Sequence, residues 1–175
     1  WISNFFRRII VKKLSIVIML IFFIFLSGCS GYVSNSDKKD IKETVDKVLS
    51  YDITYDDNLS NYINEENFYT SNYRFFYTLF LGDLSTFEYN SEIKSVKKYG
   101  KEYSACFLLN LKAEGQLIYE DQEDEENDEG HRASAEGIDV PIKVVLKKTD
   151  KGFYIKSVTE YDTLDIAKEE SDGFK

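Results

Sequence analysis

The sequence predicts an α+β fold, in which N-terminal helices pack on an antiparallel sheet of four or more strands. Apolar residues recur at helical spacing between residues 37 and 84. From about residue 91 onward, apolar and polar residues alternate as they do in half-buried strands. Helices followed by hairpin-connected strands are typical of α+β domains.

Three helices are predicted before the sheet. The first begins near Ser36 or Asp37, either of which can cap it. Its apolar stripe consists of Ile41, Val45, Val48 and Leu49. A short second helix is expected around residues 59–63, between the turn-like clusters YDDN and NEEN. The third shows helical spacing through Tyr73, Phe76, Tyr77, Phe80, Leu81 and Leu84, and this aromatic stripe is expected to lie in the core.

The predicted strands begin with a weakly alternating segment at residues 91–99. The next strand has one fully apolar face, made of Tyr103, Ala105, Phe107, Leu109 and Leu111. A kink or bulge is expected at Gly115, with continuation through residues 117–119. Cys106, in the same strand, is expected to be an inert small core residue.

The best-patterned strand carries Ile138, Val140, Ile142, Val144 and Leu146 on one face. Pro141 cannot donate to a ladder, so the early part of this strand should be an edge or a bulge. Residues 149–152 predict a hairpin turn into a last strand at 153–161. Residues 162–175 are polar and are expected to form a loose tail.

The charge balance excludes some classes of partner. Residues 1–28 contain four basic and no acidic residues, so the rest of the chain carries 18 basic and 31 acidic residues, a formal charge of −13. This balance argues against nucleic acid, whose phosphates need Lys and Arg. It also argues against a body that lies tightly on anionic lipid.

The N-terminal segment has the layout of a secretory signal. Four basic residues, Arg7, Arg8, Lys12 and Lys13, precede an apolar run from Leu14 to Leu26. The next residues complete the sequence Leu26-Ser27-Gly28-Cys29, which resembles the lipobox of bacterial lipoproteins. The resemblance implies cleavage before Cys29, diacylglycerol on its sulfur, and a lipid anchor on the extracytoplasmic face of the cell membrane. The rival interpretation is an uncleaved transmembrane anchor, which approaches the roughly 20 residues needed only by including Lys12 and Lys13.

The body of the chain resembles a second family. Its helix-then-sheet order and its ending VPIKVVLKKTDKGFYIKSVTEYD are similar to NTF2-like domains, also called cystatin-like α+β cones. The resemblance implies a long curved sheet that wraps an N-terminal helix over residues 37–161. Residues 1–28 would then be a signal-peptide helix, 29–36 a polar tether and 162–175 the tail. NTF2-like domains often pair through the open sheet face, so the resemblance is compatible with a homodimer.

The sequence offers little catalytic chemistry. The one histidine, His131, lies in an acidic segment, and the motifs HExxH, CxxC and a glycine-rich phosphate loop are absent. Candidate pocket groups are Tyr77, Tyr103, Asn110 and Tyr154. Their residue types also suit core and rim positions, so we expect neither catalysis nor a cofactor.

The acidic segment at residues 119–137 contains candidate calcium ligands, of which the weakly favoured ones are Asp121, Asp124, Glu126 and Asp128. It lacks the ligand spacing of an EF-hand loop. Like charges in a row favour a solvated hairpin tip, so we expect no metal site and no calcium binding tighter than millimolar.

These observations predict a membrane-tethered extracytoplasmic lipoprotein that acts as a binding module for an unknown protein or envelope ligand. One alternative is an immunity or accessory lipoprotein of a transport or secretion system. Another is a small NTF2-like hydrolase or isomerase. A polar cavity with a buried carboxylate of raised pKa would favour the enzyme. A filled interior with an exposed apolar patch would favour a protein partner.

Overall fold

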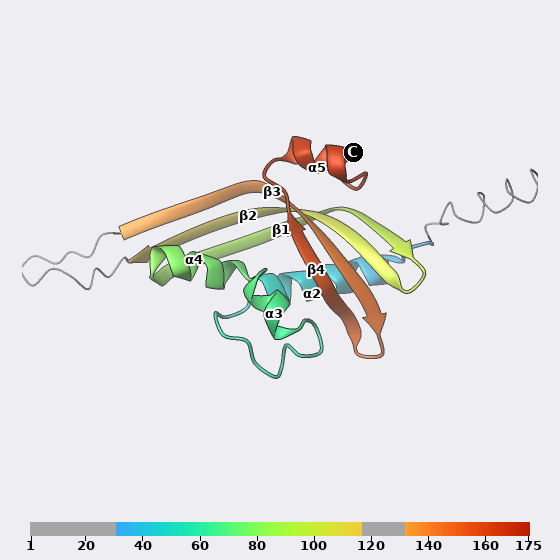
Figure 1. Ribbon diagram of the computed structural model, residues 1–175, viewed down its shortest axis with the longest axis horizontal. Coiled ribbons are helices and arrows are strands. Elements are labelled where there is room, and N and C mark those ends of the chain that lie inside the picture. The colour runs from blue at the N-terminus through green and yellow to red at the C-terminus, as the bar shows by residue number, and fades with distance from the viewer. Residues whose placement is uncertain (1–30, 117–131) are drawn as a thin grey trace, which may run out of the picture. The chain divides into compact units, whose positions relative to one another are not determined.

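The computed structural model describes residues 31–116 and 132–175. In this part of the chain, three helices are followed by a four-stranded antiparallel sheet and a last short helix (Figure 1). The elements are α2 (Asn35–Leu49), α3 (Glu65–Tyr69), α4 (Tyr73–Leu81), β1 (Asp83–Tyr99), β2 (Glu102–Gln116), β3 (Arg132–Thr149), β4 (Gly152–Glu160) and α5 (Leu164–Glu170). The strands are neighbours in chain order, β1-β2-β3-β4. The predicted α+β class is therefore confirmed.

Several predictions fall outside the described residues. They concern the signal segment, Cys29, strand residues 117–119, His131, and the acidic residues Asp121, Asp124, Glu126 and Asp128. These stay predictions. Among the helices that the structure does describe, none is long and apolar enough to cross a membrane.

Helix α2 forms the centre of the core. Its predicted stripe of Ile41, Val45, Val48 and Leu49 is fully buried, which confirms the prediction. The helix begins earlier than expected, because the Ser34 hydroxyl accepts a hydrogen bond from the Asp37 N–H at 3.0 Å and caps it. The expected tether therefore ends before residue 36, and Gly31 already pairs with Lys98 of β1.

The second helix lies later than predicted. Residues 57–62 form turns whose Leu59 side chain is fully buried, as is that of Ile63 beyond them. Helix α3 starts instead within the NEEN cluster, where the Asn64 side chain accepts from the Asn67 N–H at 2.9 Å. An Asn cap followed by acidic residues favours a helix start, which explains why α3 begins after Asn64 and not at Leu59.

Helix α4 ends at Leu81, since Gly82 adopts a positive φ of 69° and leads directly into β1. The expected core stripe is wrong for much of this helix. Phe76 is 53% exposed and Phe80 is 61% exposed, while Leu81 is buried. In Figure 1, α4 lies over the end of the sheet that α2 does not reach, so its outer face has no covering element among the described residues.

Gly115 allows α4 to approach the sheet closely. A Cβ added at this position would lie 2.4 Å from the carbonyl oxygen of Leu81. The expected irregularity lies in the partner strand, where Ser85 is the extra residue between Leu84 and Thr86 of β1.

The prediction made from Pro141 is confirmed. Strand β4 pairs with β3 only from Ile142 onward, so the earlier part of β3 is an edge on that side. A bulge at residues 138–139 lies opposite Asn110, and Asp139 has a φ of 53°. The bulge breaks the predicted alternation, which leaves Ile138 70% exposed.

The expected loose tail is wrong. Residues 164–170 form α5, which is capped by Thr163. Tyr161, Ala167 and Phe174 are buried against Cys106 and Leu108 in a second apolar cluster. Helices α2, α3 and α4 thus cover one face of the sheet, and α5 covers part of the other (Figure 1). The burial of Cys106 agrees with its expected core position.

Candidate functional site

The four predicted pocket residues do not share one site. Tyr103 is buried, and its hydroxyl donates to Asp37 Oδ2 at 3.3 Å. Asn110 is exposed and accepts from the Asp139 N–H at 3.1 Å, so it stabilises the β3 bulge. Tyr154 packs under the Lys147 ammonium, 4.6 Å from its ring centre. Tyr77 alone of these four lines the hollow beside α4 that is described next.

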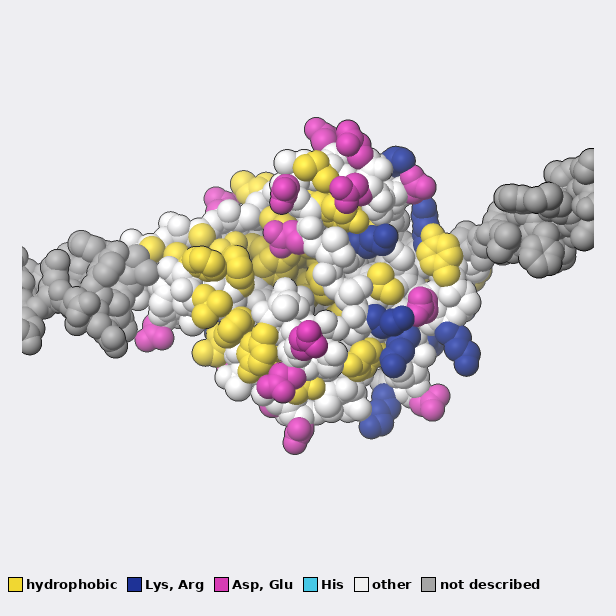
Figure 2. Space-filling view, in the orientation of Figure 1, with side chains coloured by type: hydrophobic (Ala, Val, Ile, Leu, Met, Phe, Trp, Pro, Cys, Tyr) yellow, Lys and Arg dark blue, Asp and Glu magenta, His cyan; other side chains and the backbone are white. Residues whose placement is uncertain are grey.

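An apolar patch covers the outer face of α4. We call it the α4 patch and define it as Tyr69, Phe76, Leu79 and Phe80, which are 36%, 53%, 64% and 61% exposed. The rings of Phe76 and Phe80 lie 4.7 Å apart, and the ring of Tyr69 meets that of Phe75 edge-on at 4.9 Å. Figure 2 shows hydrophobic side chains gathered at this end of the domain. Contiguous exposed aromatic surface is typical of interaction sites.

A hollow of about 220 Å³ lies between the α4 patch and the sheet. Its apolar walls include Tyr69, Phe76 and Tyr77 from the helices and Leu111, Val140 and Val158 from the strands. Sites for small organic ligands usually measure roughly 300–1,000 Å³. The hollow is smaller than that range, and its size suits a single inserted side chain.

The polar residues that line the hollow are Thr70, Ser71, Asn72, Tyr73, Tyr77 and Glu160, and three of them form a titratable group, namely the two tyrosines and the glutamate. The Tyr73 hydroxyl donates to Glu160 Oε2 at 2.5 Å. Burial, reinforced by the charge of Glu160, raises the pKa of Tyr73 far above its usual value. Burial and then Glu160 also raise the pKa of Tyr77. Both phenols therefore stay protonated near neutral pH, where they can donate hydrogen bonds but cannot serve as bases.

Four carboxylates lie close to the α4 patch in the sequence or line its hollow. Glu65 and Glu66 precede it on α3, Asp83 follows α4, and Glu160 closes the hollow, all four of them exposed. The nearby Arg74 stacks 5.8 Å from the centre of the Phe87 ring. An apolar centre with an acidic border complements a surface that has an apolar centre and basic surroundings.

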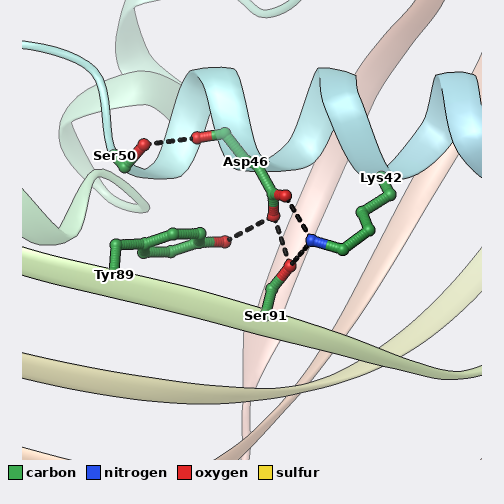
Figure 3. A network of polar contacts seen from close by, with 5 residues as sticks. All are labelled: Lys42, Asp46, Ser50, Tyr89 and Ser91. Atoms are coloured by element: carbon green, nitrogen blue, oxygen red, sulfur yellow. Dashed lines mark hydrogen bonds and ion pairs between the residues drawn. The ribbon is translucent and has the colours of Figure 1, made fainter.

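A polar network between α2 and β1 is a second candidate, which the sequence reasoning did not find (Figure 3). Lys42 Nζ donates to Asp46 Oδ2 at 2.5 Å and to Ser91 Oγ at 2.7 Å. The Ser91 hydroxyl donates to Asp46, and Tyr89 donates to the same carboxylate at 3.3 Å. The spacing of Lys42 and Asp46 on one helix face was visible in the sequence, but their partners on β1, Tyr89 and Ser91, were not.

A serine beside a lysine can form a nucleophile and base pair. Here Ser91 is only 6% exposed, and its oxygen already accepts from the Lys42 ammonium. The Lys42 ammonium is in turn paired with Asp46. Burial and the Asp46 charge raise the pKa of Tyr89, which stays a donor. We therefore conclude that the network has a structural role and holds α2 against β1.

A larger hollow, of about 460 Å³, lies between the C-terminal segment and the other face of the sheet. Its lining includes Lys97 and Lys143 together with Glu102, Glu170 and Asp172. The Ser95 hydroxyl is buried there without a hydrogen-bond partner among the described residues. Charges of both signs surround this hollow, so it favours no single ligand chemistry.

Within residues 31–116 and 132–175, no group of three or more His, Cys, Asp or Glu side chains could hold a metal ion. No protein-family model matches the chain, and no curated protein matches it.

Proposed function

We propose that the protein is a lipid-anchored extracytoplasmic lipoprotein that acts as a binding module, and that the α4 patch is its docking site for a partner protein. The observation that carries this proposal is the exposure of Phe76, Leu79 and Phe80 on one face of α4. The same interpretation includes an accessory or immunity lipoprotein, which would dock its partner through the same surface.

The composition of the patch supports a protein partner. Aromatic residues are enriched in the buried centres of protein interfaces, where a few of them supply most of the binding energy. Burying one large apolar side chain contributes about 1.5–3 kcal/mol. Phe76, Leu79 and Phe80 are each more than half exposed, and the hollow of about 220 Å³ can receive one anchor side chain.

The acidic residues near the patch indicate which kind of partner surface would fit it. Exposed Glu65, Glu66, Asp83 and Glu160 favour a partner surface with Lys or Arg around its apolar centre. They also oppose an anionic lipid surface at this end of the domain. The protonated Tyr77 hydroxyl, beside the hollow, can donate to a partner carbonyl.

The remaining parts of the proposal come from the sequence. The lipobox Leu26-Ser27-Gly28-Cys29 supports cleavage and acylation of Cys29, with the domain on the extracytoplasmic face of the cell membrane. The packing of α2 on a four-stranded meander is compatible with an NTF2-like domain, and its filled interior supports binding rather than catalysis.

The test uses a photo-reactive amino acid placed at Leu79 in the full-length protein, expressed in its native membrane. The matched control places the same group at Ile166, an exposed apolar position on α5. We expect one protein adduct from position 79, joined through a peptide in which Lys or Arg flanks an apolar residue. We expect the double substitution Phe76→Ser and Phe80→Ser to abolish the adduct, while the domain still unfolds cooperatively at a modestly lower midpoint.

Equal adducts from positions 79 and 166 would contradict the docking site, as would an adduct that survives the double substitution. An adduct with lipid alone would place the patch on the membrane and would also contradict the proposal.

A further inference from the structure

The N-terminal end of the domain is fixed to a defined place on the sheet. The Gly31 N–H donates to the Lys98 carbonyl oxygen at 3.1 Å, and the two residues form an isolated antiparallel bridge. Lys98 lies at the end of β1, beside the turn that leads into β2. The chain therefore enters the domain at this turn.

This inference rests on the proposed acylation of Cys29, which would hold the entry point of the chain close to the membrane. Cys29 precedes Gly31 by two residues, and an extended chain covers at most about 3.6 Å per residue. Gly31 would then lie within about 7 Å of the anchored residue, which is less than the screening length of about 8 Å at physiological salt. Charges at this end of the domain would feel the lipid headgroups.

This end of the domain is basic, although the chain as a whole is acidic. Residues 94–102 contain four Lys and one Glu, and residues 143–156 contain five Lys and one Asp. These nine lysines are half of the 18 basic residues that follow residue 28. The two hairpins meet where the Lys148 N–H donates to the Lys101 carbonyl at 3.3 Å. Figure 2 shows Lys and Arg side chains gathered at the end of the domain away from the hydrophobic patch.

Several of these lysines have no carboxylate partner in the described part of the chain, although Lys98 and Lys147 lie over the rings of Tyr103 and Tyr154, at 5.4 Å and 4.6 Å from the ring centres. Lys148 pairs with Asp37, and Lys156 pairs with Glu102. Within the described residues, no ion pair is recorded for Lys97, Lys98, Lys101 and Lys147.

Two exposed aromatic residues accompany these lysines. Tyr32 is 86% exposed and Tyr99 is 50% exposed, and each adjoins one of the two bridged residues, Gly31 and Lys98. Tyrosine is enriched where proteins meet the headgroup region, because its ring is apolar and its hydroxyl is polar.

We propose that this end, which we call the hairpin face and define as Tyr32, Lys98, Tyr99, Lys101 and Lys147, rests on an anionic phospholipid surface. The negative net charge of the chain as a whole argues against contact with anionic lipid, but it is unevenly spread. At this end Asp37 and Glu102 are paired with Lys148 and Lys156, and carboxylates more than a screening length away contribute little. Strand β1 runs from the α4 end to the hairpin face over 17 residues, or about 50 Å. The contact therefore orients the domain so that the α4 patch points away from the membrane.

The test is lysine acylation of the full-length lipidated protein in vesicles, followed by mass spectrometry of each lysine. One set of vesicles contains phosphatidylcholine alone, and the other adds phosphatidylglycerol. We expect labelling of Lys98, Lys101 and Lys147 to fall roughly fivefold in the anionic vesicles, and to recover at high salt. Lys112, which is exposed on β2 and paired with Glu114, serves as the internal reference and should not change.

The variant Lys98→Gln with Lys101→Gln should remove the protection of Lys147, whereas the control Lys112→Gln should leave that protection intact. The mass of the N-terminal peptide is measured in the same samples. An unmodified Cys29 would overturn both the proposed function and this inference. A lipidated Cys29 with unchanged labelling of the hairpin face, or with equal protection of Lys112, would overturn the inference alone.

Discussion

Asp37 joins the first helix to the sheet through a single buried carboxylate. Its Oδ1 accepts from Lys148 Nζ at 2.6 Å, and its Oδ2 accepts from the Tyr103 hydroxyl at 3.3 Å. The hydrogen bond and charge of Lys148 lower the pKa of Asp37 below its usual value near 3.8, against the opposing effect of burial. Asp37 also raises the pKa of Lys148, so each group favours the charged form of the other.

The substitution Asp37→Asn should therefore destabilise the domain in a pH-dependent way. A carboxyl group whose pKa is lower in the folded state stabilises that state above its unfolded pKa, and the contribution is lost as pH falls through the folded pKa. Lys148 is about half exposed, which screens the pair, so we expect a loss of about 1 kcal/mol near neutral pH. The difference from the unsubstituted protein should shrink as pH falls below the usual Asp value near 3.8 and through the lower folded-state pKa.

Urea unfolding of both proteins across this pH range measures the effect. The control Asp40→Asn changes an exposed carboxylate on the same helix and should cost much less. A difference that is constant with pH would show that the Asp37 charge does not contribute.

Among the elements, α5 shows how a short polar segment can complete a fold. Its residues appear polar in sequence because only a few of them face the protein. Ala167 and Phe174 are nonetheless buried, and the Phe174 ring meets that of Tyr161 edge-on at 5.8 Å. The Cys106 thiol lies beneath this segment, 3.7 Å from the Ser171 hydroxyl.

We expect Phe174→Ala to loosen α5 and to expose Cys106 without unfolding the domain. A loss of roughly 1 kcal/mol from the local opening equilibrium should raise the rate of maleimide labelling of Cys106 about fivefold. The matched control is Ile166→Ala, at an exposed position on the same helix. Labelling that stays equally slow in both variants would show that α5 does not protect the thiol.

Periodicity predicted the elements that are buried along their whole length. The stripe of α2 and the apolar face of β2 were correct because each residue on those faces meets the core. Periodicity could not distinguish the buried Leu81 from the exposed Phe80 next to it, because helical spacing does not show which tertiary neighbours are present. Residues 83–90 of β1 were not predicted as strand for a similar reason. The strand lies at the edge of the sheet and many of its residues are polar and exposed, so they show no clear alternation.

The candidate site was predictable only in part. Tyr77 lies at the hollow as a pocket residue should, but Tyr103, Asn110 and Tyr154 have local roles that depend on strand pairing. The bulge opposite Asn110 and the closure of the hollow by Glu160 join residues far apart in the chain. Neither contact leaves a local pattern in the sequence.

At the scale of the whole molecule, the domain has two chemically distinct ends. The hairpin face carries lysines and exposed tyrosines beside the entry of the chain, and the α4 patch lies at the other end of β1. A lipid anchor at the basic end would leave the apolar end free for a partner. Anchoring and docking would then use separate surfaces, so each can be removed without the other.

Cys29→Ser tests the anchor by itself. The core of the domain lies within residues 31–175, so we expect the unfolding midpoint to stay unchanged. Two acyl chains hold a protein stably on a membrane, whereas a few surface lysines do not resist high salt. The variant should therefore appear in a high-salt wash, or remain as an unprocessed precursor of higher mass. The control Cys106→Ser removes the buried thiol and should stay on the membrane. A processed Cys29→Ser protein that resists the wash would show that another element holds the domain there, and it would overturn the lipid anchor at Cys29 together with the membrane contact of the hairpin face that rests on it.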